Sequence, residues 1–276
     1  MTEPATAPRI LLRRLIDYAG MYPPESLGLE EAISTYLRHR RGAHEWMLGP
    51  FLCPSSVLHD LEWLLGGDPI PVGVVFDQPA EDAFASIAAS ALSIQQVETT
   101  DLAIEHLLRE LDASLTFWLE AEPSRVHTVA GRNPGRRIGV KIRCGGSTPA
   151  DFPTPVALAS GMHETFERGL PLKATAGLHH PWRHFSAEVG AWRHGFLNLA
   201  AAAAALVGTG DLNQVEEILS IEQPGVLSGH HLRVGEHEFS PADLRSARVF
   251  FRSYGSCSFD EPVEDLEAMG SLWSAR

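Results

Sequence analysis

Two lysines near the middle of the chain lie in similar short segments. Lys141 lies in GVKIRCGG (139–146) and Lys173 in LKATAGLHHP (172–181), 32 positions later. Each segment reads as a short strand that ends in small residues and glycine. A lysine in a buried strand is costly unless its charge is used or neutralised. The spacing, about that of one strand–helix–strand unit, therefore predicts a functional site on two neighbouring strands.

Side chains along a strand alternate between its two faces, and this alternation predicts which residues face the site. Val140 and Ile142 form an apolar set that should face surrounding helices, which points Lys141 and Arg143 to the opposite side. The same alternation points Lys173 and Thr175 inward. Two nearby ammonium groups lower each other's pKa, and an amine with a lowered pKa can form a Schiff base with a carbonyl. We therefore expect Lys141 and Lys173 to be catalytic, and Arg143 and Thr175 to bind substrate.

Carboxylates at the ends of other predicted strands could balance this charge. The candidates are Asp17, Asp77, Glu98 and Glu120. Glu98 and Asp77 end their strands most cleanly, so we expect one of them to move a proton during catalysis. Asp17 is predicted to contact the substrate.

Histidines follow the second lysine segment. His179 and His180 are expected to act as acid or base, and His184 lies four residues after His180. That spacing suits metal ligands on one helix face, but Pro181 lies between them and no zinc motif is present, so no metal site is assigned. His194 is interpreted as a packing residue.

A small-residue stretch, SYGSCSFDEP (253–262), precedes a predicted helix near the end of the chain. Backbone amides at such a junction can hold an anion, which makes Ser256 and Ser258 candidate substrate-binding residues. The alternative is helix capping by Ser258 or Asp260.

The order of elements predicts the fold that positions these residues. Apolar runs alternate with helical patterns, which indicates a parallel sheet covered by helices. We favour a (β/α)₈ barrel, TIM-barrel-like, over an open doubly wound sheet, because the length fits and no glycine-rich dinucleotide motif follows the first strand. Active-site residues of such barrels lie at the carboxyl ends of the strands. The runs read as strands are 13–20, 44–53, 70–77, 94–100, 115–122, 137–146 and 171–177.

The last part of the barrel is the hardest to assign. Residues 247–254 could close it as an irregular eighth strand, after a helix that Ser240 caps. Further helices are expected at 29–41, 55–65, 80–92, 101–112, 154–169 and 187–208. We read residues 1–276 as a single domain in which 209–276 is a C-terminal elaboration with helical content.

Composition sets the class of protein. A chain of 276 residues at 44% hydrophobic can bury a sizeable core, and its net charge of −13 disfavours nucleic acid as a partner. Three cysteines far apart fit a reducing compartment. No signal peptide or membrane span is apparent, so we expect a cytoplasmic protein with a small-molecule substrate and no cofactor, membrane or nucleic-acid partner. Assembly into a homo-oligomer stays open.

The two lysine segments resemble class I aldolases of the deoxyribose-phosphate aldolase kind, over about residues 137–181. In that family one strand carries the Schiff-base lysine, the next carries a second lysine followed by small residues, and an earlier strand supplies an acid. The resemblance implies that Lys141 forms the Schiff base and that Lys173 lowers its pKa. KATAGLHHP and GSCSFDEPVEDL are also similar to segments of bacterial proteins with no assigned activity.

These observations lead to one preferred function and two alternatives. The preferred function is an aldolase-type lyase that acts on a small carbonyl compound, free or phosphorylated, through a Schiff base on Lys141. One alternative is an isomerase or hydrolase that uses His179 and His180 as acid and base or as metal ligands. The other is a barrel that binds an anion without catalysis.

Overall fold

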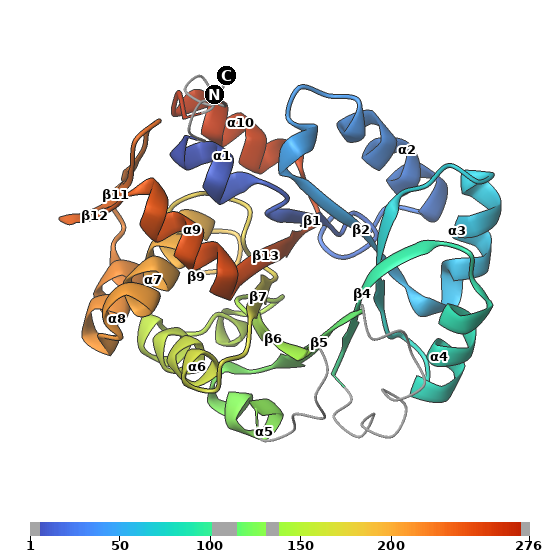
Figure 1. Cartoon of the computed structure of the whole chain (residues 1–276), viewed down its shortest axis with the longest axis horizontal. Helices are drawn as coiled ribbons and strands as arrows, with labels where there is room; N and C mark the ends of the chain where they lie inside the picture. The colour runs from blue at the N-terminus through green and yellow to red at the C-terminus, as the bar shows by residue number, and fades with distance from the viewer. Residues whose placement is uncertain (1–5, 101–114, 131–137, 272–276) are drawn as a thin grey trace.

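The computed structural model of the chain describes residues 6–100, 115–130 and 138–271, and it contains a closed barrel of eight parallel strands (Figure 1). The first seven barrel strands are neighbours in chain order, and β13 lies between β7 and β1. The predicted (β/α)₈ barrel is therefore confirmed. The barrel strands are β1 (Ile16–Tyr18), β2 (Leu48–Pro54), β3 (Pro71–Val75), β4 (Ser93–Thr99), β5 (Thr116–Ala121), β6 (Ile138–Arg143), β7 (Leu172–Thr175) and β13 (Phe251–Ser256).

Helices surround the barrel, as Figure 1 shows. Most follow their strands as expected, although the predicted helix over 101–112 lies outside the described residues. In the described part of the chain the α-helices are α1 (Ala7–Leu12), α2 (Leu29–Arg40), α3 (Leu58–Leu65), α4 (Ala80–Ala89), α5 (Val126–Ala130), α6 (Pro155–Glu167), α7 (Phe196–Thr209), α8 (Leu212–Ser220), α9 (Pro241–Phe250) and α10 (Asp260–Ala268). No helix in the described ranges is long and apolar enough to cross a membrane.

The hydrophobic core lies between the strands and the helices, and the barrel interior is polar in its lysine-bearing part. Val140, Ile142, Leu172 and Ala174 belong to the core, as the strand alternation predicts. Lys141 on β6 and Lys173 on β7 therefore point to the other face, into the barrel. Register β6–β7 places these two lysines directly opposite each other.

Two assignments near the end of the chain need correction. The helix expected over 187–208 begins only at Phe196, because residues 184–193 form an antiparallel hairpin of β8 (His184–Ser186) and β9 (Ala191–Arg193). Gly190, with φ of 71°, supplies the left-handed turn between these strands. A Cβ on Gly195 would overlap the carbonyl of Pro181, so the chain passes there too closely for a helix that runs through.

The segment 209–276 does more than elaborate the barrel. It contributes α8 and a small antiparallel sheet of β10 (Val226–Leu227), β11 (Leu232–Val234) and β12 (His237–Phe239). It then supplies α9, whose first turn Ser240 caps, and the eighth strand β13, which pairs with β7 and β1. The strand begins four residues later than the 247–254 run predicts, at Phe251. Without this segment the barrel would stay open.

Candidate active site in the barrel interior

The two lysines form the centre of a buried charged cluster. Lys173 is fully enclosed and Lys141 is 6% exposed. They face each other from adjacent strands, yet they are not an isolated pair of like charges. Carboxylates from three other strands lie among them, namely Asp17 of β1, Glu98 of β4 and Glu120 of β5.

Glu98 bridges both lysines. Its Oε2 lies 2.6 Å from Nζ of Lys141, and its Oε1 accepts a hydrogen bond from Nζ of Lys173. Glu98 is 0% exposed, so these contacts replace all of its hydration. Glu98 thus lies beside both lysines, while its expected role in proton transfer stays a prediction.

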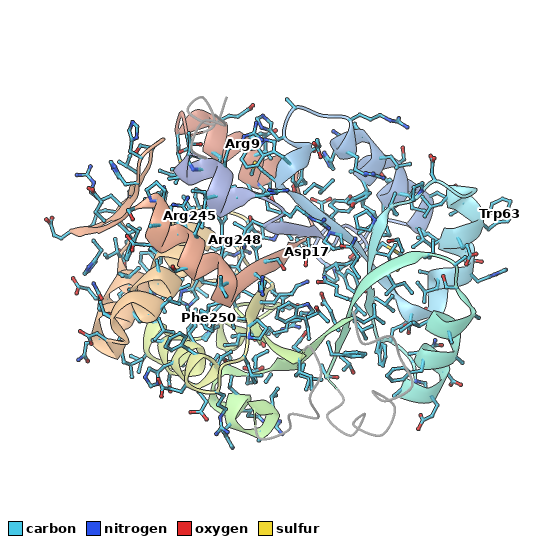
Figure 2. The ribbon with its side chains drawn as sticks, viewed as in Figure 1. Arg9, Asp17, Trp63, Arg245, Arg248 and Phe250 are labelled. Carbon is cyan, nitrogen blue, oxygen red and sulfur yellow. The ribbon has the colours of Figure 1, made fainter. Side chains whose placement is uncertain are left out.

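Asp17 neutralises Lys173 from the other side. Its Oδ2 pairs with Lys173 Nζ and also accepts hydrogen bonds from Ser253 Oγ at 3.0 Å and Gln96 Nε2 at 2.9 Å. Figure 2 labels Asp17 among the barrel strands. Because this carboxylate is 1% exposed and holds three donors, its geometry fits the positioning of Lys173 rather than the substrate contact expected from the sequence.

Hydrogen bonds from Gln96 hold the carboxylates of Asp17 and Glu98 in place beside the lysines. Gln96 donates from Nε2 to Asp17 and to Glu98 Oε1, at 3.3 Å in the second case. Its own Oε1 accepts a hydrogen bond of 3.0 Å from the Trp118 indole. Since both polar ends of the Gln96 amide are occupied, its orientation is fixed, and with it the spacing of the two carboxylates.

The cluster reaches solvent on the side of Glu120. Lys141 Nζ lies 2.8 Å from Glu120 Oε2, and Arg143 Nη1 lies 3.1 Å from Glu120 Oε1. Exposure of the side chain rises from 7% at Lys141 to 16% at Glu120 and 45% at Arg143. A molecule from solvent would therefore meet Arg143 and Glu120 first and Lys141 next, while Lys173 stays out of reach.

The electrostatics differ from the expectation that the lysines lower each other's pKa. Burial disfavours the charged form of Lys141, but Glu98 and Glu120 outweigh it and raise the Lys141 pKa. Burial likewise disfavours the charged form of Glu98, yet Lys141 and Lys173 lower the Glu98 pKa to about 2. The expected lowering of the Lys141 pKa is therefore wrong, because the sequence reading did not place a carboxylate between the two amines.

Asp77 does not join the cluster. Its carboxylate accepts hydrogen bonds from Ser55 Oγ at 2.8 Å, from Ser56 N at 3.0 Å and from Ser56 Oγ at 2.5 Å. Those hydrogen bonds outweigh the effect of burial and lower the Asp77 pKa. Among the described residues no contact supports the expected proton transfer by Asp77, and the two serines anchor the β3–α4 connection.

The histidines after β7 contact α10 rather than the lysines. His179 Nδ1 lies 2.5 Å from Glu261 Oε2, and its Nε2 lies 3.7 Å from Cys257 Sγ. His180 Nδ1 lies 2.7 Å from Asp265 Oδ2. Each ring is thus oriented by a carboxylate, an arrangement that suits an acid or base.

The two other histidines, His184 and His194, pack against neighbouring residues. His184 packs edge-on against His180, and burial lowers its pKa. His194 is 0% exposed, contacts the Pro153 carbonyl at 2.8 Å, and burial lowers its pKa to about 4. Within the described residues no group of three or more His, Cys, Asp or Glu side chains could hold a metal ion.

The predicted substrate-binding hydroxyls are partly occupied. Ser256 Oγ donates to the Ser258 carbonyl at 2.6 Å, and Ser258 Oγ accepts from the Glu261 amide at 3.2 Å. Ser258 therefore contacts the first turn of α10, although the N-cap residue of that helix is Phe259. Thr175 ends β7 and is half-buried opposite the partly exposed Arg143.

One further hydroxyl near the cluster was missed by sequence reasoning. Tyr22, in the β1–α2 connection, has a buried hydroxyl without a hydrogen-bond partner among the described residues. Burial and the negative charges of Glu98 and Asp77, with the nearby Cys53, raise its pKa above the ordinary value. Nothing in the local sequence marks this tyrosine, because it lies in a connection far from the strands it approaches.

A feature of composition was also missed. The chain has 22 basic residues, of which two are lysines and 20 are arginines, and both lysines lie in this cluster. Arginine stays protonated in proteins, whereas a lysine can give up its proton and act as an amine. Lysine therefore occurs in this chain only where an amine lies among carboxylates in the barrel.

The fold and the cluster define a (β/α)₈ barrel with a buried site of two amines and three carboxylates. A scan against protein-family models and a search of the curated proteins each gave no match.

Proposed function

We propose that the protein is an aldolase-type lyase in which the Lys141 amine forms a Schiff base with a small carbonyl substrate. The observation that carries this proposal is the placement of both lysines of an arginine-rich chain in one buried cluster. Lys141 is the reactive amine in this proposal because it is slightly exposed and contacts the more exposed Glu120, whereas Lys173 is fully enclosed. No cofactor is required for this chemistry.

The proposed reaction assigns each neighbour a role. Lys141 loses one proton to solvent on the Glu120 side of the cluster and attacks the carbonyl carbon through Nζ. The carbonyl oxygen then takes one proton from Nζ and one from solvent and leaves as water. The resulting iminium withdraws electrons from the adjacent carbon–carbon bond, which breaks or forms. Glu98 remains ionised and stabilises the cation, and the Tyr22 hydroxyl, which stays protonated, would donate a hydrogen bond to a substrate oxygen.

The raised pKa of Lys141 shapes this reaction. At neutral pH most of the amine is protonated, so the attack needs either higher pH or a substrate that displaces the contact with Glu120. Arg143 supports the second route, because it already holds Glu120 and can keep that carboxylate aside. Arg143 and Thr175 would then contact the part of the substrate nearest to solvent.

The contacts favour this proposal over the two alternatives. Simple anion binding is disfavoured because the lysine charges are already matched by Asp17, Glu98 and Glu120. A hydrolase built on His179 has the orienting Glu261 and the nearby Cys257 in its favour. Burial, however, raises the Cys257 pKa to about 11, which leaves little thiolate for attack.

Isotope exchange tests the proposed chemistry without knowledge of the natural substrate. We expect the protein to accelerate, above the rate in buffer alone, two exchanges of a short ketone. The iminium exchanges α-protons in D₂O by losing one to form an enamine, and its hydrolysis in H₂¹⁸O exchanges the carbonyl oxygen. Lys141→Arg keeps the positive charge beside Glu98 and Glu120 but lacks a nucleophilic amine, and it should abolish both exchanges. Proton exchange without oxygen exchange would instead indicate an enolate reaction and contradict the Schiff base.

A further inference from the structure

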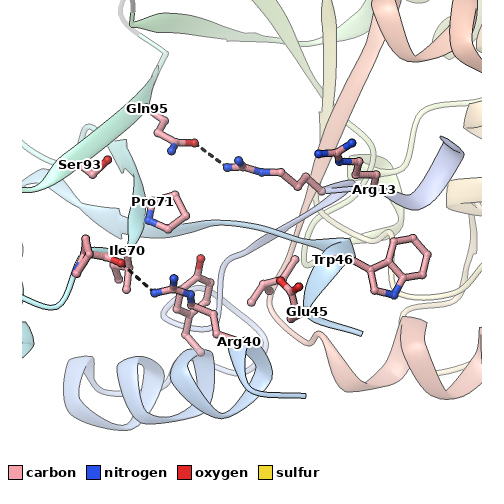
Figure 3. Close-up of a pocket in the computed structure, with 12 residues that line it drawn as sticks. Arg13, Arg40, Glu45, Trp46, Ile70, Pro71, Ser93 and Gln95 are labelled. Carbon is pink, nitrogen blue, oxygen red and sulfur yellow. Dashed lines mark hydrogen bonds between the residues drawn. The ribbon is translucent and has the colours of Figure 1, made fainter. Parts of the chain in front are cut away.

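A separate cavity of about 420 Å³ opens at the other end of the barrel, where the strands begin (Figure 3). Its walls come from Arg13 and Arg14 before β1, from Arg40 at the end of α2, and from the first residues of β2, β3 and β4. None of the cluster residues around Lys141 lines it. Its volume falls in the range of small-molecule binding sites.

The cavity concentrates positive charge in an acidic protein. Three arginines line it against a single carboxylate, Glu45, while the whole chain carries −13. Their hydrogen bonds go to neutral acceptors, from Arg14 Nη2 to Gln95 Oε1 at 2.7 Å and from Arg40 Nη1 to the Pro69 carbonyl at 3.0 Å. In the described part of the chain none of the three arginines forms an ion pair with a carboxylate. Their positive charge is therefore available to a ligand.

The backbone of Arg14 supports this interpretation. Arg14 has φ of 49°, a left-handed conformation that is unfavourable for a residue other than glycine. Its amide donates to the Trp46 carbonyl at 2.8 Å, and its side chain reaches Gln95 on β4. Backbone strain of this kind persists where surrounding contacts enforce it, often at ligand-binding positions. Here it directs a guanidinium along the cavity wall.

The remaining wall is apolar. Leu48, Ile70, Pro71 and Trp46 line the cavity beside the arginines, and Figure 3 shows Pro71 between Gln95 and Arg40. We propose that this cavity binds an organic phosphate, with the phosphate held by Arg13, Arg14 and Arg40 and the organic part against Ile70 and Pro71. Guanidinium groups bind phosphate through paired hydrogen bonds, which suits several arginines around one cavity.

Calorimetric titration with phenyl phosphate tests this site, because that probe carries a phosphate and an apolar ring but no carbonyl. We expect saturable binding at one site, several-fold tighter than binding of inorganic phosphate at equal ionic strength. Arg40→Gln should weaken binding at least tenfold, and Arg13→Gln should weaken it similarly. Thermal unfolding of each variant establishes that it is folded, and neither changes the strained position 14.

Two controls locate the binding. Arg245→Gln removes an exposed arginine of α9, labelled in Figure 2, and should leave the affinity unchanged. Lys141→Arg alters only the barrel interior and should also leave it unchanged. Absence of saturable binding at millimolar phenyl phosphate, equal affinity in Arg40→Gln, or an equal loss in Arg245→Gln or Lys141→Arg would overturn the proposal.

Discussion

Glu98 helps to keep the Lys141 amine protonated in the barrel interior. It lies between two ammonium groups and has no contact with water, so its charge is stabilised only by those neighbours. Removal of one partner from such a buried network costs more stability than the ion pair itself contributes. The reason is that the remaining charges stay buried without a partner. The site therefore depends on a residue that does not itself react in the proposed mechanism.

Glu98→Gln should lower the free energy of unfolding at neutral pH by up to about 3 kcal/mol, since the folded-state pKa is lowered from 4.5 to about 2. A lowered carboxyl pKa gives stability that is present above the ordinary pKa and is lost as the pH falls through the folded value. The difference between wild type and variant should therefore shrink as the pH falls from about 5 toward 2.

Urea denaturation across that pH range measures this difference. Glu188→Gln, which removes a carboxylate that is 86% exposed, is the matched control and should have little effect at any pH. A Glu98→Gln difference that stays constant with pH would show that the lysines do not hold Glu98 ionised.

At the residue scale, strand alternation predicted the inward direction of the lysines and a strand end marked Glu98, but neither predicted the contacts among them. Gln96 and Trp118 each precede a cluster carboxylate by two positions and could have been recognised by the same alternation. Asp77 ends a strand as cleanly as Glu98 does, yet Ser55 and Ser56 bind it. Those contacts join segments far apart in the sequence, so a strand-by-strand reading could not foresee them.

At the element scale, one glycine on β6 makes room for a large side chain on β5. Gly139 on β6 stands opposite Trp118 on β5, and a Cβ at Gly139 would overlap the Trp118 ring. The missing side chain gives the indole its place in the barrel interior, where it donates to Gln96. The pairing of these two strands therefore supports the carboxylate geometry.

Gly139→Ala should destabilise the protein by roughly 1–3 kcal/mol, because the new methyl group displaces Trp118 in a packed interior. Chemical denaturation monitored by tryptophan fluorescence measures the change. Gly208→Ala in α7 is the control: its Cβ would meet nothing within 4 Å, and alanine should stabilise that helix by about 0.5–1 kcal/mol. Equal effects of the two substitutions would contradict the proposed packing.

Element boundaries show where local patterns mislead. Residues 187–195 carry an apolar spacing compatible with a helix, but the turn at Gly190 and the close approach at Gly195 end that possibility. In contrast, Thr154 and Ser240 cap α6 and α9 through contacts within three residues. Capping contacts between residues close in sequence can be predicted from the sequence. The close approach of Gly195 to Pro181 can be seen only in the tertiary structure.

At the scale of the whole molecule, the two ends of the chain complete one barrel. β1, near the start of the described residues, pairs with β13, near their end. The charged cluster likewise draws on both ends, from Asp17 on β1 to Ser253 on β13. Folding of the site therefore requires closure of the barrel.

A chain shortened to residues 1–240 should lose cooperative unfolding, because β1 and β7 would each expose an unpaired edge. Thermal unfolding followed by circular dichroism in the far and near ultraviolet measures this. A sharp transition of the shortened chain, coincident in both spectra, would show instead that the last segment is an elaboration on an independent domain.

The proposed chemistry is tested most directly by borohydride reduction in the presence of short aldehydes and ketones, free and phosphorylated, with mass mapping of the adduct. With two lysines in the chain the assignment is unambiguous. We expect one adduct, on Lys141, and none in Lys141→Arg. Because the Lys141 pKa is raised, the trapping rate should increase as the pH rises above neutral. No adduct with any carbonyl compound, or an adduct on Lys173, would contradict a Schiff base on Lys141.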